Sequence, residues 1–320
     1  MKEIGGYSEL EHLEGREYHE NALKLNCGRN AIVLAAKLRN VNRVFLPHYL
    51  CASVAEALKQ HEIECCFYGV DALFQPIFPV DCGKDDMLLA VNYYGQLHTE
   101  ELIRTYSDRT NLLIDNTQAF FEKAPEGADA VYSCRKFFGI PDGAYLYTPL
   151  SHAAPLFEPE QVAERCGHLL GRLEGPASTH LETHRSNDRL FSSQPIGGMS
   201  LFTQNILRAV NYDHVRRKRN ENYNTLHEAL SHRNKLKLTT PDGPFAYPFY
   251  IENGPAVRKQ LAAQKIYVPT LWPNVLELPE NLLERKYTEN ILPLPCDQRY
   301  STTDMKRILE VLELCTNSEK

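Results

Sequence analysis

The sequence lacks any apolar run near the roughly 18 residues that a membrane-spanning helix requires. It also lacks an N-terminal secretory signal, because Met1, Lys2 and Glu3 lead directly into polar sequence. Its nine cysteines include no C-x-x-C pair, and scattered cysteines without a signal are typical of reduced thiols in a cytoplasm. We therefore expect a cytoplasmic protein with no membrane partner.

Signatures of nucleotide-binding and nucleic-acid-binding proteins are missing as well. No G-x-G-x-x-G follows a predicted strand and no P-loop pattern is present, so a dinucleotide site has no support. The net charge of −6 gives no reason to expect nucleic acid as a partner. A short basic run, Arg216 to Arg219, lies within a helical pattern, and we predict that it is a solvated face.

Histidine forms no metal-binding pattern. His12 and His19 are seven residues apart, but no cysteine or carboxylate cluster completes a site. Both lie in residues 1–20, a polar segment that we predict to be an arm crossing the surface or a partner subunit. We expect both side chains to be solvated, with no bound metal.

The composition is that of an ordinary globular protein, with 43% hydrophobic and 24% charged residues. A chain of 320 residues can bury about three quarters of its unfolded surface and needs no disulfides or metals for stability. Its length predicts one large domain and one smaller domain. We place a large α/β domain at residues 1–210, with the arm at 1–20, and a small α+β domain at 211–320.

Short apolar runs alternate with helical patterns through the first half of the chain. This alternation predicts a mostly parallel sheet with helices on both faces. The predicted strands are 43–47, 63–67, 87–92, 112–114, 128–132 and 144–147, and the predicted helices are 31–38, 52–60 and 102–107.

The second half of the chain shows weaker patterns. Residues 151–193 contain several Pro, Gly and Ser, and we predict that they are irregular. Apolar residues then recur at helical spacing from Leu201 to Leu230, which predicts one long helix. In the small domain we predict strands at 247–251 and 266–268 and a helix at 255–264.

Polar side chains follow two neighbouring predicted strands at the point where each ends. Asp115 ends one strand, with Gln118 just beyond it, and Ser133 ends the next, followed by Arg135 and Lys136. Functional groups gather at the carboxyl ends of such strands. A lysine attacks an aldehyde only when it is neutral, and a neighbouring cation such as Arg135 lowers its pKa. The plainer alternative is a surface lysine on a turn and a carboxylate that caps a helix.

Two further turns carry candidate residues. Gly28 and Arg29 stand where a turn enters the apolar helix 31–38, and a helix start presents free N–H groups that suit a phosphate. Arg29 adds a charged donor to that place. Tyr49 follows the predicted strand 43–47, where it either packs at a helix start or presents its ring to a ligand.

The stretch from Ile114 to Ala119 (IDNTQA), then Ser133 and Lys136, with Gly143 and Ala144 seven residues later, resembles the core of the DegT/DnrJ/EryC1/StrS aminotransferases. The resemblance implies a fold-type-I transferase that uses pyridoxal 5'-phosphate (PLP) and works as a homodimer. The chain departs from the family in three places: Ser133 and Lys136 are three residues apart instead of five, Gly28-Arg29 lacks the usual hydroxyl, and residues 195–199 lack the usual Asn.

The resemblance also implies a role for each candidate residue. Lys136 is the catalytic lysine and binds the cofactor covalently. The other cofactor-binding residues are Asp115 at the pyridine nitrogen, Gln118 at the ring hydroxyl, Ser133, Gly28 and Arg29 at the phosphate, and Tyr49 against the ring.

The implied activity is transfer of an amino group, with glutamate the usual donor, to a keto sugar that is linked to a nucleotide. Such a reaction belongs to polysaccharide or glycan biosynthesis. Two alternatives remain open. One is a PLP-dependent sugar dehydratase of the same family, although known dehydratases can carry histidine in place of the lysine. The other is a protein of this fold that has lost catalysis and serves as a binding or regulatory module.

Overall fold

The computed structural model describes residues 4–317. The first three residues of the predicted arm and the last three of the predicted small domain therefore lie outside the described range. Within residues 4–317, no helix is both long and apolar enough to cross a membrane. All nine cysteines fall inside this range and are free thiols.

A seven-stranded sheet forms the centre of the described chain. Its strands run in the spatial order β1-β7-β6-β5-β4-β2-β3. The strands from β6 to β3 are parallel to one another, whereas β7 pairs antiparallel with both β6 and β1. The mostly parallel sheet predicted from the sequence is therefore confirmed. Its strands are β1 (Leu23–Leu25), β2 (Arg43–Pro47), β3 (Glu64–Tyr68), β4 (Met87–Val91), β5 (Asn111–Asp115), β6 (Asp129–Ser133) and β7 (Ala144–Tyr147).

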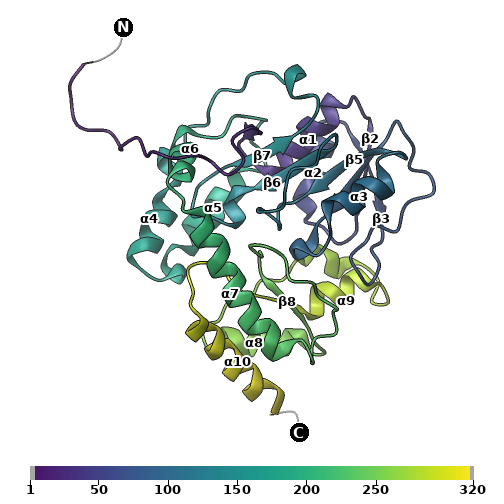
Figure 1. Cartoon of the computed structure of the whole chain (residues 1–320), viewed down its shortest axis with the longest axis vertical. Helices are drawn as coiled ribbons and strands as arrows, with labels where there is room; N and C mark the ends of the chain where they lie inside the picture. Colours follow the sequence, from purple (N-terminus) through teal and green to yellow (C-terminus); the bar gives the residue numbers. More distant parts are fainter. Residues whose placement is uncertain (1–3, 318–320) are drawn as a thin grey trace.

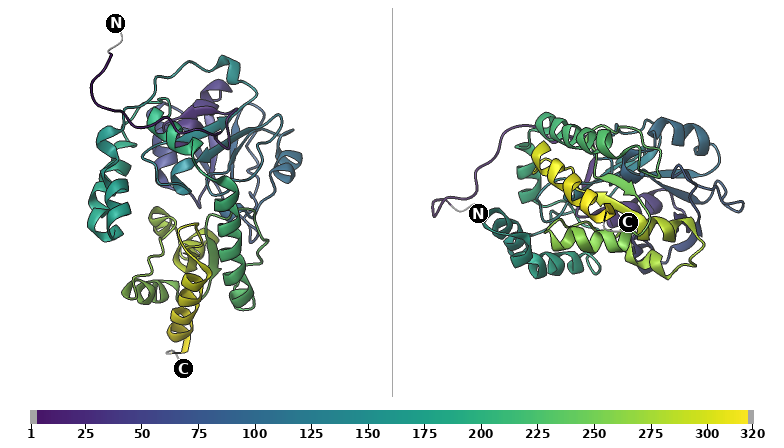
Figure 2. Two further views of the ribbon diagram at one scale, coloured as in Figure 1. Left: turned by 60° about the vertical axis from the view of Figure 1, so that its left-hand side comes forward. Right: turned by 90° about the horizontal axis from the view of Figure 1, so that it is seen from below.

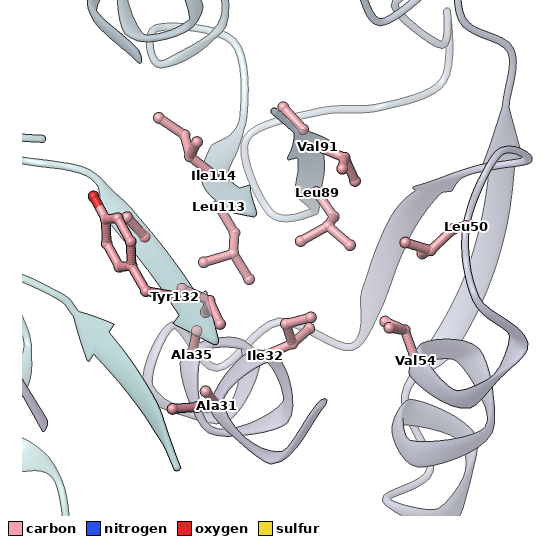
Figure 3. Packing of buried hydrophobic residues seen from close by; sticks show 14 of the residues in the cluster. Ala31, Ile32, Ala35, Leu50, Val54, Leu89, Val91, Leu113, Ile114 and Tyr132 are labelled. Carbon is pink, nitrogen blue, oxygen red and sulfur yellow. The ribbon is translucent and has the colours of Figure 1, made fainter. Parts of the chain in front are cut away.

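Burial of apolar side chains explains why the central strands form. Every residue of β4 and of β6 is buried, as expected for strands covered on both faces. Helix α1 (Gly28–Leu38) packs small side chains against this surface. Figure 3 shows Ile32 of α1 facing Leu113 of β5 and Leu89 of β4, with Ala31 and Ala35 on the same helix.

The remaining helices of the large domain cover and extend the sheet. Residues 151–193, predicted to be irregular, contain two helices that pack against each other, so this prediction is wrong. In the left-hand view of Figure 2, these two teal helices lie on the outer flank of the large domain. The helices are α2 (Ala52–Gln60), α3 (Thr99–Tyr106), α4 (Gly167–Glu174), α5 (Leu181–Leu190) and α6 (Leu201–Arg208).

The long helix predicted from Leu201 to Leu230 is in fact two helices, α6 and α7 (Tyr212–Leu230). The break falls at Asn211, whose side chain accepts a hydrogen bond from the backbone N–H of His214 at 3.0 Å and so caps α7. Helix α7 runs out of the large domain into the lower part of the molecule (Figure 1).

A second hydrophobic cluster forms around α7 and a two-stranded antiparallel sheet, whereas Val275, Tyr287 and Ile291 of the predicted small domain belong to the cluster of the large sheet. The strand predicted at 266–268 is wrong: Ile266 and Val268 are buried in the second cluster but pair with no strand. Lys265 has a φ of 60°, and its turn ends the preceding helix. The elements are β8 (Tyr247–Tyr250), β9 (Ile291–Leu294), α8 (Gly254–Ala263), α9 (Leu283–Asn290) and α10 (Thr302–Asn317).

The N-terminal arm is anchored where it meets the sheet, and His19 is buried rather than solvated. The Nε2 of His19 donates to the carbonyl oxygen of Phe120 at 2.8 Å, and its Nδ1 lies 3.3 Å from the hydroxyl of Tyr147. Its ring packs 4.1 Å from the ring of Tyr132, centroid to centroid. Burial lowers the pKa of His19 to about 4.

This burial predicts a loss of stability in mild acid. His19 titrates near 6.5 in the unfolded chain, so its contribution is complete above that pH and is lost as the pH falls toward 4. Between pH 8 and pH 5, His19 should lower the free energy of unfolding by about 2 kcal/mol. Urea unfolding at pH 8 and at pH 5 measures this difference in the free energy of unfolding. The variant His19→Gln should lack this part of the loss, whereas His12→Gln, at an exposed position, should keep it.

Candidate active site

The candidate site lies at the carboxyl edge of the sheet, where β5 and β6 end side by side. Asp115 is the last residue of β5, and Ser133 is the last residue of the parallel strand β6. A single turn of 3₁₀ helix (Cys134–Lys136) then carries Lys136. The Nζ of Lys136 donates a hydrogen bond of 2.7 Å to the Oγ1 of Thr117, which follows β5. The structure thus brings Lys136 and the Asp115 segment together, as the sequence predicted.

The Asp115 carboxylate is buried, with 4% of the residue exposed. Its Oδ1 accepts a hydrogen bond of 2.8 Å from the backbone N–H of Thr117. No ion pair to Asp115 forms among residues 4–317, so its second oxygen remains available. A buried carboxylate without a cation is costly unless a ligand supplies one.

The surroundings of Lys136 lower the pKa of its amine and so favour the neutral form. The side chain of Lys136 is accessible because it lines an open cavity of about 850 Å³, while protein surrounds it on the other sides. This desolvation lowers the pKa of Lys136 below its usual value, and the nearby charge of Arg135 lowers it further. Asp115 and the Cys51 thiol oppose the shift. The expected contribution of Arg135 is therefore present, although smaller than that of burial.

The start of α1 faces the same place. A Cβ atom added to Gly28 would lie 3.6 Å from Cγ2 of Thr117, so the helix begins beside the Lys136 partner. Cys27, which precedes α1, is extended and makes no side-chain capping hydrogen bond. Arg29 is half-buried and forms no ion pair within the described chain. The N–H groups of a helix start and a guanidinium without an ion pair together suit a phosphate.

Gln118 and Ser133 are both placed at this edge, and both are buried. The Oε1 of Gln118 accepts a hydrogen bond of 2.9 Å from the backbone N–H of Tyr94, which has a φ of 56°. The Nε2 of Gln118 makes no hydrogen bond to any described residue and remains a donor for a ligand. Ser133 is 9% exposed, and its side chain does not cap the turn that carries Lys136.

Tyr49 is placed differently from the prediction. Its side chain is 0% exposed, and its ring packs edge-on against Trp272 with a centroid distance of 5.0 Å. Its hydroxyl lies 3.3 Å from that of Tyr94. A ring that stacks on a cofactor needs an accessible face, and Tyr49 has none, so the structure argues against that role.

Two residues near Lys136 were missed from the sequence. Thr117 contacts it directly, and Cys51, half-buried before α2, is close enough to influence its pKa. Thr117 lies between Asp115 and Gln118, so a hydroxyl inside the recognised motif was the available signal. The sequence pattern gave no reason to choose Cys51 as a site residue instead of Tyr49, which lies in the same turn.

The cavity beside Lys136 is lined mainly by apolar side chains and also holds several basic residues. Its lining combines residues of α4 and of the turn at Lys136 with residues of the small domain. Asp297 is the only acid in it. Its basic residues are Arg135, Lys136, Arg172, Arg219 and Arg299.

Arg219 departs from the predicted solvated face, because it is 1% exposed whereas the rest of the basic run is accessible. Its Nε donates to Oε1 of Gln298 at 2.8 Å, and its Nη1 donates to the carbonyl of Pro244 at 2.8 Å. The carbonyl of Phe137 accepts from both Nη2 of Arg219 (3.3 Å) and Nε2 of Gln298 (2.8 Å). The peptide that follows Lys136 is therefore held from the small domain.

A scan against protein-family models and a search of curated protein sequences found no match. Solved structures do match. Sugar aminotransferase CalS13 from Micromonospora echinospora aligns with a TM-score of 0.66 at 13% identity, over 92% of this chain and 87% of that chain. The chain has the fold of the sugar aminotransferases. The predicted fold-type-I transferase architecture is thereby confirmed.

Two further structures share this sugar aminotransferase fold. DesV from S. venezuelae aligns with a TM-score of 0.64 at 18% identity, over 92% of this chain and 84% of that chain. A DegT DnrJ EryC1 StrS aminotransferase from Brucella abortus aligns with a TM-score of 0.61 at 16% identity, over 91% of this chain and 85% of that chain. Its name is that of the family whose motif the sequence resembles. At these identities the likeness establishes the fold, and the roles of individual residues remain predictions.

The buried network around Arg219 predicts a stability effect. Replacing Arg219→Met removes donors from the carbonyls of Pro244 and Phe137 and from Gln298, and it should lower the free energy of unfolding by about 1–3 kcal/mol. Arg217→Met is the matched control on the same helix, because its side chain is 60% exposed and pairs only with the accessible side chains of Glu221 and His214 among the described residues. It should change stability by less than about 0.5 kcal/mol. Equal effects of the two substitutions in urea unfolding would contradict the assignment.

Proposed function

We propose that this protein is a PLP-dependent aminotransferase that transfers an amino group to a keto sugar. The observation that carries the proposal is the contact between Nζ of Lys136 and Thr117, two residues beyond the buried carboxylate of Asp115. It joins a lysine of lowered pKa to an unpaired acid at the carboxyl edge of a sheet with the sugar aminotransferase fold.

The residues present fit PLP. Asp115 has a free oxygen for the pyridine nitrogen, Gln118 has a free donor for the ring hydroxyl, and the guanidinium of Arg29, which forms no ion pair among the described residues, suits the phosphate. Gly28 at the start of α1 and Ser133 at the end of β6 complete the phosphate end. Spr1654 from Streptococcus pneumoniae, a structure of this fold (TM-score 0.64, 11% identity), is known in a PLP form and a PMP form.

The chemistry divides between the cofactor and the chain. When bound, PLP withdraws electrons from the substrate carbon and makes its proton acidic. Lys136 supplies the base, because burial lowers the pKa of Nζ and so increases the neutral fraction that can take a proton. Nζ then returns the proton as an acid. The backbone N–H of Thr117 donates to Oδ1 of Asp115 and so holds the carboxyl group beside these groups.

The basic residues of the cavity support a nucleotide-linked keto sugar as acceptor. Arginine binds phosphate oxygens in a bidentate manner, and the cavity lining includes Arg135 and Arg172, whereas Arg219 is buried in its own hydrogen bonds and Arg299 pairs with Asp297. Its volume of about 850 Å³ falls in the usual range for small-molecule sites. We infer glutamate as the amino donor and polysaccharide or glycan biosynthesis as the process, in the cytoplasm.

A homodimer is part of the proposal. Helices α4 and α5 carry exposed leucines: Leu181 and Leu190 on α5, and Leu170 and Leu173, which also line the cavity, on α4. Exposed apolar side chains on neighbouring helices favour a protein partner. The arm of residues 4–16 is also exposed, including Ile4 and Tyr7, and a second copy would cover it.

The cofactor proposal is tested by the visible absorption spectrum of the purified protein with added PLP, before and after borohydride. We expect a yellow adduct that borohydride fixes, with the label on Lys136 when peptides are mapped by mass. Lys136→Ala should remain folded but lack both the adduct and turnover. Lys123→Ala is the control, because Lys123 is exposed in the segment that joins β5 to β6.

A colourless protein without adduct would overturn the proposal and would favour the binding-module alternative, to which the altered phosphate site lends support. Retention of PLP without conversion to the pyridoxamine form by any amino donor would instead favour the dehydratase alternative. Full activity of Lys136→Ala would exclude the assigned role of the lysine.

Arg29 gives a second prediction. Since its guanidinium replaces the hydroxyl expected at this turn, Arg29→Ala should weaken PLP binding by about 10- to 100-fold, through loss of a charge-assisted hydrogen bond worth about 1.5–3 kcal/mol. Arg29→Lys should retain part of the affinity. Titration of the cofactor-free protein with PLP, followed by fluorescence, measures the affinity. An unchanged affinity in Arg29→Ala would contradict the assignment of Arg29 to the phosphate.

A further inference from the structure

We propose that Thr117 is a positioning residue whose hydroxyl holds Nζ of Lys136 in place and serves as its hydrogen-bond partner both when the amine is protonated and when it is neutral. The inference rests on the proposed function for its meaning in catalysis. Its geometry depends only on this chain.

The contact between the two side chains is short and well supported. The distance from Nζ of Lys136 to Oγ1 of Thr117 is 2.7 Å, and Nζ makes no other hydrogen bond within residues 4–317. Thr117 is 7% exposed, and its backbone N–H is fixed to Oδ1 of Asp115 at 2.8 Å. The hydroxyl therefore cannot follow the lysine into solvent.

The branched side chain of threonine sets the direction of the hydroxyl. Cγ2 of Thr117 faces the start of α1, 3.6 Å from where a Cβ of Gly28 would be. Because threonine carries two heavy atoms on Cβ, fixing the methyl also fixes Oγ1. A side chain at Gly28 would reach that methyl only in ordinary van der Waals contact, so the start of α1 lies beside Thr117 and its partner Lys136.

A hydroxyl suits this position for a chemical reason. It accepts a hydrogen bond from an ammonium and, after rotation, donates one to a neutral amine, so it can accompany the lysine through both protonation states. A carboxylate in the same contact would stabilise the ammonium much more strongly. Asp115 forms no ion pair with Lys136 within the described residues, and Thr117 occupies the contact instead.

The test is competitive labelling of lysines with acetic anhydride in cofactor-free full-length protein, over a range of pH, with Lys136 quantified by peptide mass. Thr117→Val keeps the shape and removes the hydroxyl. We expect it to lower the apparent pKa of Lys136 by about 1, since the ammonium loses its acceptor while the burial remains. Thr117→Ser should keep the wild-type value, and Lys123 in each sample is the internal control.

A wild-type titration of Lys136 in Thr117→Val overturns the proposal. Circular dichroism and thermal unfolding establish that the variant is folded; if it is not, Thr117→Ala is measured in its place, and an unchanged pKa there overturns the proposal equally. Because the labelling uses no cofactor, its result is independent of PLP binding. Trapping of PLP at Lys136 with an unchanged Thr117→Val titration would leave the proposed function standing and this inference refuted.

Discussion

The parallel register of β5 and β6 is the constraint on which the candidate site depends. Asp115 pairs with Val131, so β6 extends two residues further to Ser133 before it turns to carry Lys136. The lysine consequently returns over the end of β5 and meets Thr117. A one-residue slip would turn every buried side chain of the strand to the opposite face, so the fully buried strands fix the lysine as firmly as they fix the core.

Lys136 is held from two sides by different parts of the chain. The large domain supplies Thr117 to its amine, and the small domain supplies Arg219 and Gln298 to the carbonyl of the next residue, Phe137. Arg219 donates to three carbonyl oxygens and to Gln298, with no carboxylate partner within residues 4–317, and burial lowers its pKa to about 10. Desolvating a guanidinium in this way costs free energy. We therefore infer that Arg219 holds the turn that carries Lys136 in place against the C-terminal part of the chain.

The sequence predicted the sheet well because its strands are apolar runs punctuated by Gly, Pro and Asp, and β2 and α2 have the bounds that the pattern indicated. It failed where a tertiary contact decides the structure. Helix α5 is rich in polar residues, helix α4 has only eight residues, and the break at Asn211 depends on one capping side chain. The edge strand β1 has three residues and needs β7 as a template.

The same division applies to the site. Asp115, Gln118 and Lys136 follow strand ends, so their convergence could be predicted from strand order alone, whereas the burial of Tyr49 depends on Trp272 and Tyr94, which come from distant segments. Thr117 is intermediate between a residue that strand order predicts and one whose place distant contacts decide. An acid and a lysine so close would lock each other in the charged state if they paired directly. The hydroxyl between their segments keeps the lysine in position and leaves the free carboxylate oxygen for another cation, the arrangement that a protonated heterocyclic ring requires.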